Sequence, residues 1–134
     1  MQTVLVIEDN RSIMMVNERV LTKAGYHVLG AADGEQALLV ARDNIPDLIL
    51  LDMMLPKLGG EEVLRSLKQN PATAPIPVIV VTSLSQKNEE KLRDEGAAAF
   101  LDKNNLFNNP EFLLQAVGKI LAKNKAIAKL PVLT

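Results

Sequence analysis

The chain has 134 residues, 48% of them hydrophobic, which suits one domain with a single core and leaves too few residues for two. It contains no cysteine, so disulfides, thiolate zinc sites and cysteine nucleophiles are excluded. Fifteen Lys and Arg against sixteen Asp and Glu give a net charge of −1, which argues against direct nucleic acid binding.

Five short runs rich in β-branched residues and leucine predict buried strands, because continuous apolar runs of this length are typical of parallel sheets. The predicted strands cover residues 3–7, 27–31, 48–51, 78–81 and 98–101. Longer stretches with apolar residues at helical spacing separate them, the first carrying Ile13, Val16 and Val20. This alternation predicts an α/β fold with a doubly wound parallel sheet and helices on both faces.

The last two predicted helices differ in how firmly they should be anchored. The final helix, from about Pro110, carries a continuous apolar stripe that should pack on the sheet. The preceding helix, residues 86–95, has only one strongly apolar residue, Leu92, so it is a candidate for movement. We expect a domain over residues 1–124 and a C-terminal tail over residues 125–134.

Polar residues follow four of the predicted strands. Glu8 and Asp9 follow the first, Asp52 follows the third, Thr82 follows the fourth and Lys103 comes after the fifth. The carboxyl ends of parallel strands meet at one edge, so we expect these groups to converge there. Three carboxylates in a partly dry cleft repel one another, and a hard divalent cation relieves the repulsion. The pattern therefore predicts a Mg²⁺ site.

Each of these residues also has an ordinary structural explanation. Glu8 and Asp9 taken alone would more often be a solvated pair that caps the next helix. Thr82 suits a strand because it is β-branched, and Lys103 suits a surface. Asp52 is harder to dismiss, because a carboxylate at the end of a buried apolar run is costly without a partner or a function. Their joint placement at successive strand ends favours a functional site.

The segments VLVIEDN, AGYHVLGAADGEQAL, LILLDMMLPKLGG, IPVIVVTS and AAAFLDK carry these residues. Together they resemble the receiver domain of response regulators, from Val4 to about Leu121. The resemblance implies a flavodoxin-like sheet with strand order 2-1-3-4-5. It also implies a signalling switch of a two-component system, which accepts a phosphoryl group and changes its partner-binding surface, rather than an enzyme with an external substrate.

The resemblance assigns a role to each residue. Asp52 is the phosphoacceptor. Mg²⁺ is held by Glu8 and Asp9, directly or through water, together with Asp52 and the backbone carbonyl of Met54. Two residues grip the phosphoryl oxygens, namely Thr82 and Lys103. Phe100 is the aromatic residue that swings inward when the Thr82 hydroxyl moves, and it could otherwise be a plain core residue.

The implied phosphodonor is a sensor histidine kinase or a histidine phosphotransfer protein, and the implied output is an interaction with a downstream protein target.

The N-terminal sequence lacks a basic start, and no stretch approaches ~20 uninterrupted apolar residues. We therefore expect a cytoplasmic chain without membrane insertion. The resemblance also implies that the chain assists its own phosphorylation and dephosphorylation.

Two departures and three alternatives remain open. Lys103 is followed by Asn104, where most receivers have a proline and a cis peptide, and the loop over residues 104–109 is longer than usual. A degenerate receiver that acts as an unphosphorylated scaffold is the nearest alternative. A haloacid dehalogenase-like phosphatase would need a DxD element after the first strand, and that motif is absent because Glu8, Asp9 and Asn10 stand there. A flavodoxin-like flavin carrier would need a phosphate-binding loop where Glu8 and Asp9 stand.

Overall fold

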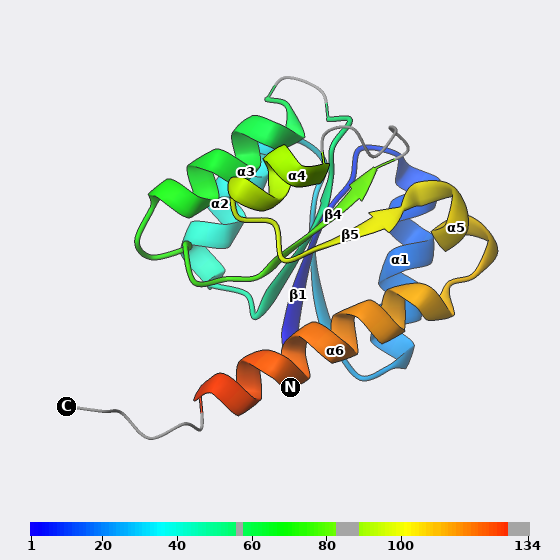
Figure 1. The fold of residues 1–134 in the computed structure, drawn as a ribbon. Helices are drawn as coiled ribbons and strands as arrows, with labels where there is room; N and C mark the ends of the chain where they lie inside the picture. The colour runs from blue at the N-terminus through cyan, green and yellow to red at the C-terminus, as the bar shows by residue number, and fades with distance from the viewer. Residues whose placement is uncertain (56–57, 83–88, 129–134) are drawn as a thin grey trace.

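The computed structural model describes residues 1–55, 58–82 and 89–128. Within these ranges strands and helices alternate along the chain (Figure 1). The strands are β1 (Thr3–Ile7), β2 (His27–Ala31), β3 (Leu48–Asp52), β4 (Val78–Thr82) and β5 (Ala99–Asp102). The helices are α1 (Arg11–Lys23), α2 (Gly34–Asn44), α3 (Gly60–Gln69), α4 (Glu89–Asp94), α5 (Lys103–Asn108) and α6 (Glu111–Ala128).

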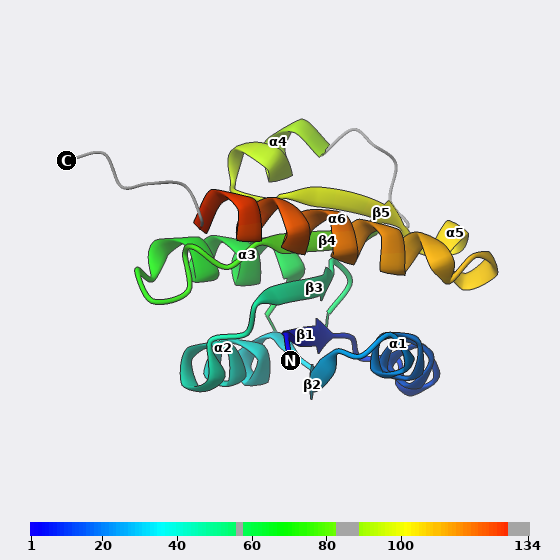
Figure 2. The same ribbon diagram turned by 90° about the horizontal axis from the view of Figure 1, so that it is seen from below.

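The five strands form one parallel sheet in the order β2-β1-β3-β4-β5, which confirms the predicted fold class and strand order. Figures 1 and 2 show α2, α3 and α4 on one face of the sheet and α1, α5 and α6 on the other. The winding direction reverses between β1 and β3, which are neighbours in the sheet. Folds of this class bind their ligands at that reversal, beyond the carboxyl ends of the strands.

Successive apolar side chains of the buried strands point to opposite faces of the sheet and form two apolar cores, one on each face. In β3, Ile49 and Leu51 join the core under α2 and α3, while Leu48 and Leu50 join the core under α1 and α6. Successive side chains of a strand point to opposite faces, so an unbroken apolar run is required where both faces are covered. Asp52 ends this run and is only 2% exposed.

The fourth helix, α4, is short and weakly buried. Leu92 is its buried apolar side chain, 5% exposed, in agreement with the sequence pattern. The predicted helix began at residue 86, and residues 86–88 lie outside the described residues. Charged contacts join this region to α3, with Lys91 Nζ 2.8 Å from a Glu61 oxygen and a guanidinium nitrogen of Arg65 3.0 Å from a Glu95 oxygen.

The segment after β5 is helical, so the expectation of a loop over residues 104–109 is wrong. Residues 103–108 form helix α5, because the Asp102 carboxylate accepts a hydrogen bond from the Asn104 N–H at 2.8 Å and caps the first turn. The Lys103–Asn104 peptide is trans, like every other peptide in the described ranges.

The final helix, α6, begins at Glu111, close to the expected start at Pro110, and continues through Ala128. The helix therefore crosses the proposed division between residues 124 and 125, and that division stays a prediction. The buried side chains of Leu113, Val117 and Leu121 lie on its sheet-facing side. Among the described helices, none combines the length and apolar character needed to cross a membrane.

Candidate functional site

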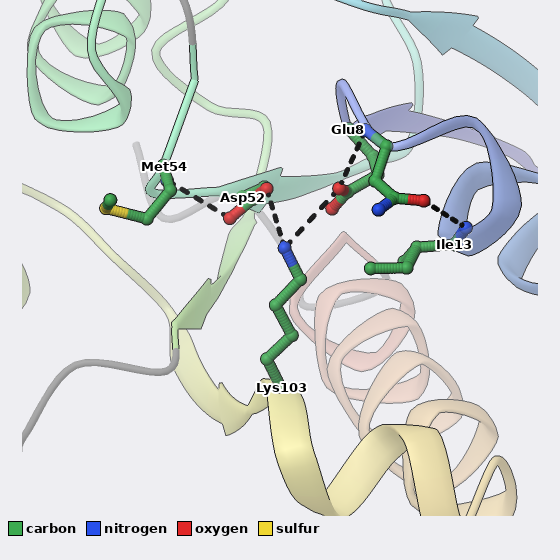
Figure 3. Close-up of polar contacts among 6 residues, drawn as sticks. Glu8, Ile13, Asp52, Met54 and Lys103 are labelled. Carbon is green, nitrogen blue, oxygen red and sulfur yellow. Dashed lines mark hydrogen bonds and ion pairs between the residues drawn. The ribbon is translucent and has the colours of Figure 1, made fainter.

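A buried charged cluster lies at the carboxyl edge of the sheet, where the winding direction reverses. Glu8 follows β1, Asp52 ends β3 and Lys103 follows β5 at the start of α5. Figure 3 shows the Lys103 side chain reaching towards Asp52 and Glu8. The Nζ atom of Lys103 is 3.0 Å from Asp52 Oδ2 and 3.4 Å from Glu8 Oε1. One ammonium group thus bridges two carboxylates that are 98% and 96% buried.

Backbone amides complete the coordination of the two carboxylates. The Met54 N–H donates to Asp52 Oδ1 at 3.1 Å, and the Asn10 N–H donates to Glu8 Oε1 at 3.1 Å. The Asn10 side chain also accepts from the Ile13 N–H at 3.1 Å, which fixes the first turn of α1 close to Glu8. These bonds hold both carboxylates in place, because each carboxylate accepts a hydrogen bond from a backbone N–H two residues further along the chain.

The loop after Asp52 is packed tightly against the start of α3. A Cβ atom placed on Gly60 would lie 2.6 Å from Met53 Cα and 2.9 Å from the Asp52 carbonyl oxygen. Both contacts are with backbone, which cannot move aside as a flexible side chain can. A residue without a side chain is therefore needed at the helix start for the strand end carrying Asp52 to keep its position.

Burial and the neighbouring carboxylate change the acid–base behaviour of Glu8. Burial, followed by the hydrogen bond and the negative charge of Asp52, raises the Glu8 pKa from 4.5 to about 7. For Lys103, partial burial lowers the pKa, but the hydrogen bond to Asp52 and the charges of Asp52 and Glu8 outweigh it and raise the pKa above 10.5. Lys103 is therefore a fixed cation at neutral pH, whereas Glu8 exchanges a proton near neutrality.

Three carboxylates meet at this edge and could hold a metal ion. One oxygen from each of Glu8, Asp9 and Asp52 lies within 4.8 Å of the others. Opposite oxygens in a Mg²⁺ octahedron are about 4.2 Å apart, so oxygens within 4.8 Å of one another can reach one ion after a small side-chain adjustment or through bound water. Oxygen ligands with a partly open side are the donor set that Mg²⁺ prefers. The residues present fit the predicted ion.

The two proposed switch residues lie on the neighbouring strands. Thr82 ends β4 and is half-buried, and it directly follows Val81, whose Cα pairs with that of Asp52. Phe100 lies in β5 and packs partly buried against the core that contains Leu92. The structure therefore brings Glu8, Asp9, Asp52 and Lys103 together, with Thr82 one residue further along the adjacent strand. The role of the Met54 carbonyl as a ligand stays a prediction.

The sequence model of the response regulator receiver domain family matches residues 4–117, which is most of the chain. The chain belongs to this family. A curated relative, the polar-differentiation response regulator DivK of Brucella anthropi, is 37% identical over 103 residues, covering 76% of this chain and 84% of DivK.

Solved receiver structures superpose closely on the chain. The chemotaxis protein CheY4 of Vibrio cholerae is 29% identical with a TM-score of 0.81, covering 89% of this chain and 98% of CheY4. A putative response regulator from Chloroflexus aurantiacus is 31% identical with a TM-score of 0.82, covering 90% of this chain and 98% of the other. Receiver domains are phosphoacceptors rather than ordinary enzymes, so the dehalogenase-like and flavin-carrier alternatives are set aside.

Sequence reasoning missed two features of this receiver domain. The Arg93 guanidinium lies over the Phe100 ring, 5.0 Å from its centroid, and joins α4 to β5. Nothing in the residue spacing signals that contact, because it depends on how a short helix returns to the sheet. Helix α5 had a readable signal, since Asp102 precedes Lys103 as an N-cap residue precedes a helix.

Proposed function

We propose that this receiver domain is a phosphorylation-activated signalling switch. It takes a phosphoryl group onto Asp52 from a histidine kinase or a histidine phosphotransfer protein, and it then presents a changed surface to a downstream protein target. The observation that carries the proposal is the setting of the Asp52 carboxylate. It is 98% buried yet lies at an open strand end, 3.0 Å from the Lys103 ammonium.

The chemistry needs little more than positioning and charge. An oxygen of Asp52 forms a bond to phosphorus while the P–N bond to the donor imidazole breaks, and the imidazole leaves with the electron pair. No general base is needed, because an ionised carboxylate is already the reactive form. Lys103 balances negative charge on the phosphoryl oxygens, and the Thr82 hydroxyl is assigned to the same oxygens by the family pattern.

The three carboxylates supply the metal site of the proposal. Glu8, Asp9 and Asp52 would hold Mg²⁺, with the Met54 carbonyl as a further ligand from the family pattern. Bound there, Mg²⁺ would neutralise phosphoryl charge that Lys103 alone cannot balance. The presence of acceptor, acids, hydroxyl and lysine together favours the switch over the degenerate scaffold, which would not need to keep all of them.

Treatment of the chain with a small phosphodonor and Mg²⁺ tests this function directly. Intact-mass spectrometry should show one added phosphoryl group, and chelation of Mg²⁺ should prevent its appearance. A phosphorylated histidine phosphotransfer domain offered as the donor should give the same product. If neither donor gives an adduct while the protein is folded and Mg²⁺ is present, the scaffold function is the better account.

Removal of Asp9 should weaken Mg²⁺ binding more than removal of Glu8. Asp9 is exposed and can approach the ion, whereas Glu8 is already engaged by Lys103 and the Asn10 N–H, and the Glu8 pKa is raised to about 7. We expect Asp9→Ala to lower Mg²⁺ affinity by about tenfold or more and Glu8→Ala by less. Calorimetric titration with Mg²⁺ measures both, and Asp94→Ala, an exposed acid on α4, serves as the control. Equal affinity in the wild type and Asp9→Ala would contradict the site.

The signal is proposed to travel through Phe100 to α4. Phosphorylation draws the Thr82 hydroxyl towards the phosphoryl oxygens, and the Phe100 ring moves into the space that it leaves. The ring then leaves its place under the Arg93 guanidinium, so α4 loses one of its contacts with the sheet. With Leu92 as its buried apolar anchor, α4 responds to the loss of a single contact.

Replacing Arg93 by alanine should loosen α4 without phosphorylation. An exposed cation–π contact is worth about 0.5–1 kcal/mol, so the loss of this contact should make amide hydrogen exchange in α4 at least about twofold faster. Exchange in α2, on the same face of the sheet, should not change. Arg19→Ala, which removes an exposed arginine from α1, is the control. Unchanged exchange in α4 of Arg93→Ala would exclude this contact as part of the switch.

A further inference from the structure

A cavity of about 260 Å³ lies beside the charged cluster, between α1 and α5. Its floor is the sheet and its walls are the two helices. The apolar lining consists mainly of Val6, Leu50, Val81, Ile13, Val16 and Leu106. Helix α5 forms one wall, so the short helix that begins at Lys103 shapes a space that no sequence pattern predicts.

One end of the cavity is charged. Glu8, Asp52 and Lys103 all contribute to its lining, and Figure 3 shows the Ile13 side chain extending from α1 towards the Lys103 side chain. The Asp9 carboxylate lies within 4.8 Å of the other two acids. Within the lining two carboxylates therefore face one ammonium group, with the Asp9 carboxylate close to both, and this end of the cavity is a site for additional positive charge.

The size of the cavity sets the size of a ligand. An apolar cavity of about 150 Å³ is large enough to take up benzene, so this larger space holds a ring or branched alkyl group with a short arm. A second anion is disfavoured, because it would meet the carboxylates at close range. A neutral hydrocarbon would fill the apolar part and leave the excess negative charge unbalanced.

We propose that this cavity binds a small organic amine. Its aromatic or branched aliphatic group lies between α1 and α5, and its ammonium group lies at the carboxylates of Glu8 and Asp52. Such a ligand shares the acidic end of the cavity with Mg²⁺, so the two cations oppose each other's binding. The binding itself is independent of phosphorylation. Only its consequence, reduced phosphorylation at low Mg²⁺, rests on the proposed function.

The probe for this site is 2-phenylethylamine, titrated into the metal-free chain by calorimetry. Two comparators separate charge from apolar contact, since 2-phenylethanol keeps the ring without the charge and methylamine keeps the charge without the ring. We expect the amine to bind at least tenfold more tightly than either comparator. Added Mg²⁺ should weaken amine binding, and Asp52→Asn should reduce the advantage of the amine over the alcohol.

A pair of substitutions on α1 locates the binding site. Val16 lines the cavity and is 43% exposed, whereas Met15 is 55% exposed and is not part of the lining. Val16→Trp places bulk into the cavity mouth and should weaken binding of 2-phenylethylamine at least tenfold, while Met15→Trp should leave it unchanged. Circular dichroism checks that both variants are folded.

Three outcomes overturn the proposal, namely no saturable binding of the amine, equal affinity for 2-phenylethanol, or equal affinity in Val16→Trp and the wild type. If Val16→Trp does not fold, the site is tested by measuring the amine affinity of the wild type with and without Mg²⁺. An amine affinity that Mg²⁺ does not change then contradicts the proposed site. Phosphorylation without amine is measured separately on the wild type. A chain that is phosphorylated but binds no amine refutes this inference alone, and one that binds amine but is not phosphorylated refutes only the switch.

Discussion

Replacing Asp52 by asparagine is expected to abolish phosphorylation of this receiver domain. The amide has no anionic oxygen to attack phosphorus, and it also removes one of three charges from the metal site. Intact-mass spectra of Asp52→Asn after treatment with a small phosphodonor and Mg²⁺ should lack the phosphoryl adduct that the wild type shows. The loss should be complete rather than partial, because no other described residue combines this burial with contacts to Lys103 and Glu8.

The matched control for this experiment is Asp43→Asn. Asp43 is an exposed acid on α2 whose side chain is paired with Arg42, and it lies outside the charged cluster. Asp43→Asn should be phosphorylated as fully as the wild type. A full adduct on Asp52→Asn would show that another side chain is the acceptor, whereas loss of the adduct in both variants would show a general defect of the protein.

The fold could be predicted because each local pattern agreed with the same architecture. The continuous apolar run before Asp52 can be buried only in a sheet covered on both faces, and β3 is buried throughout. The strand order was not readable from the runs themselves. It came from the family resemblance, since alternating strands and helices are compatible with more than one winding order.

The composition of the site was predictable for a similar reason. Parallel strands bring their carboxyl ends to one edge, so Glu8, Asp52 and Lys103 had to approach one another once the strands were assigned. The distances were not predictable. In particular, the contact of Lys103 with both carboxylates depends on α5 beginning at Lys103 itself, where the sequence had indicated a loop.

Contacts that depend on tertiary position escaped prediction altogether. Arg93 and Phe100 belong to different elements, and neither residue type alone indicates a cation–π pair. The cavity beside α5 is a further example, because its walls are set by the distance between two helices rather than by any motif. A shift of one turn in α5 would move Leu106, and the space would change without any change in the strand-end residues.

The free energy of unfolding of the metal-free chain should fall as the pH rises from 5 to 8. Burial, with the hydrogen bond and charge of Asp52, raises the folded-state pKa of Glu8 to about 7 from 4.5. Between these values the folded chain binds more protons than the unfolded chain, so rising pH favours unfolding. The shift corresponds to about 3 kcal/mol, lost progressively between pH 4.5 and 7. Lys103 does not contribute to this slope, because its raised pKa acts only above pH 10.5.

Urea unfolding of the wild type and Glu8→Gln at several pH values, with a chelator present, measures this effect. Glutamine keeps the size of the side chain and cannot ionise, so Glu8→Gln should lose most of the slope and should be more stable than the wild type at pH 8. Glu111→Gln removes an exposed carboxylate at the start of α6 and should keep the wild-type slope. A wild-type stability that is constant from pH 5 to 8, or a slope that survives in Glu8→Gln, would mean that Glu8 ionises in the folded chain as freely as in water. The electrostatic repulsion between the Glu8 and Asp52 carboxylates would then be absent, and a bound cation would have no repulsion to reduce.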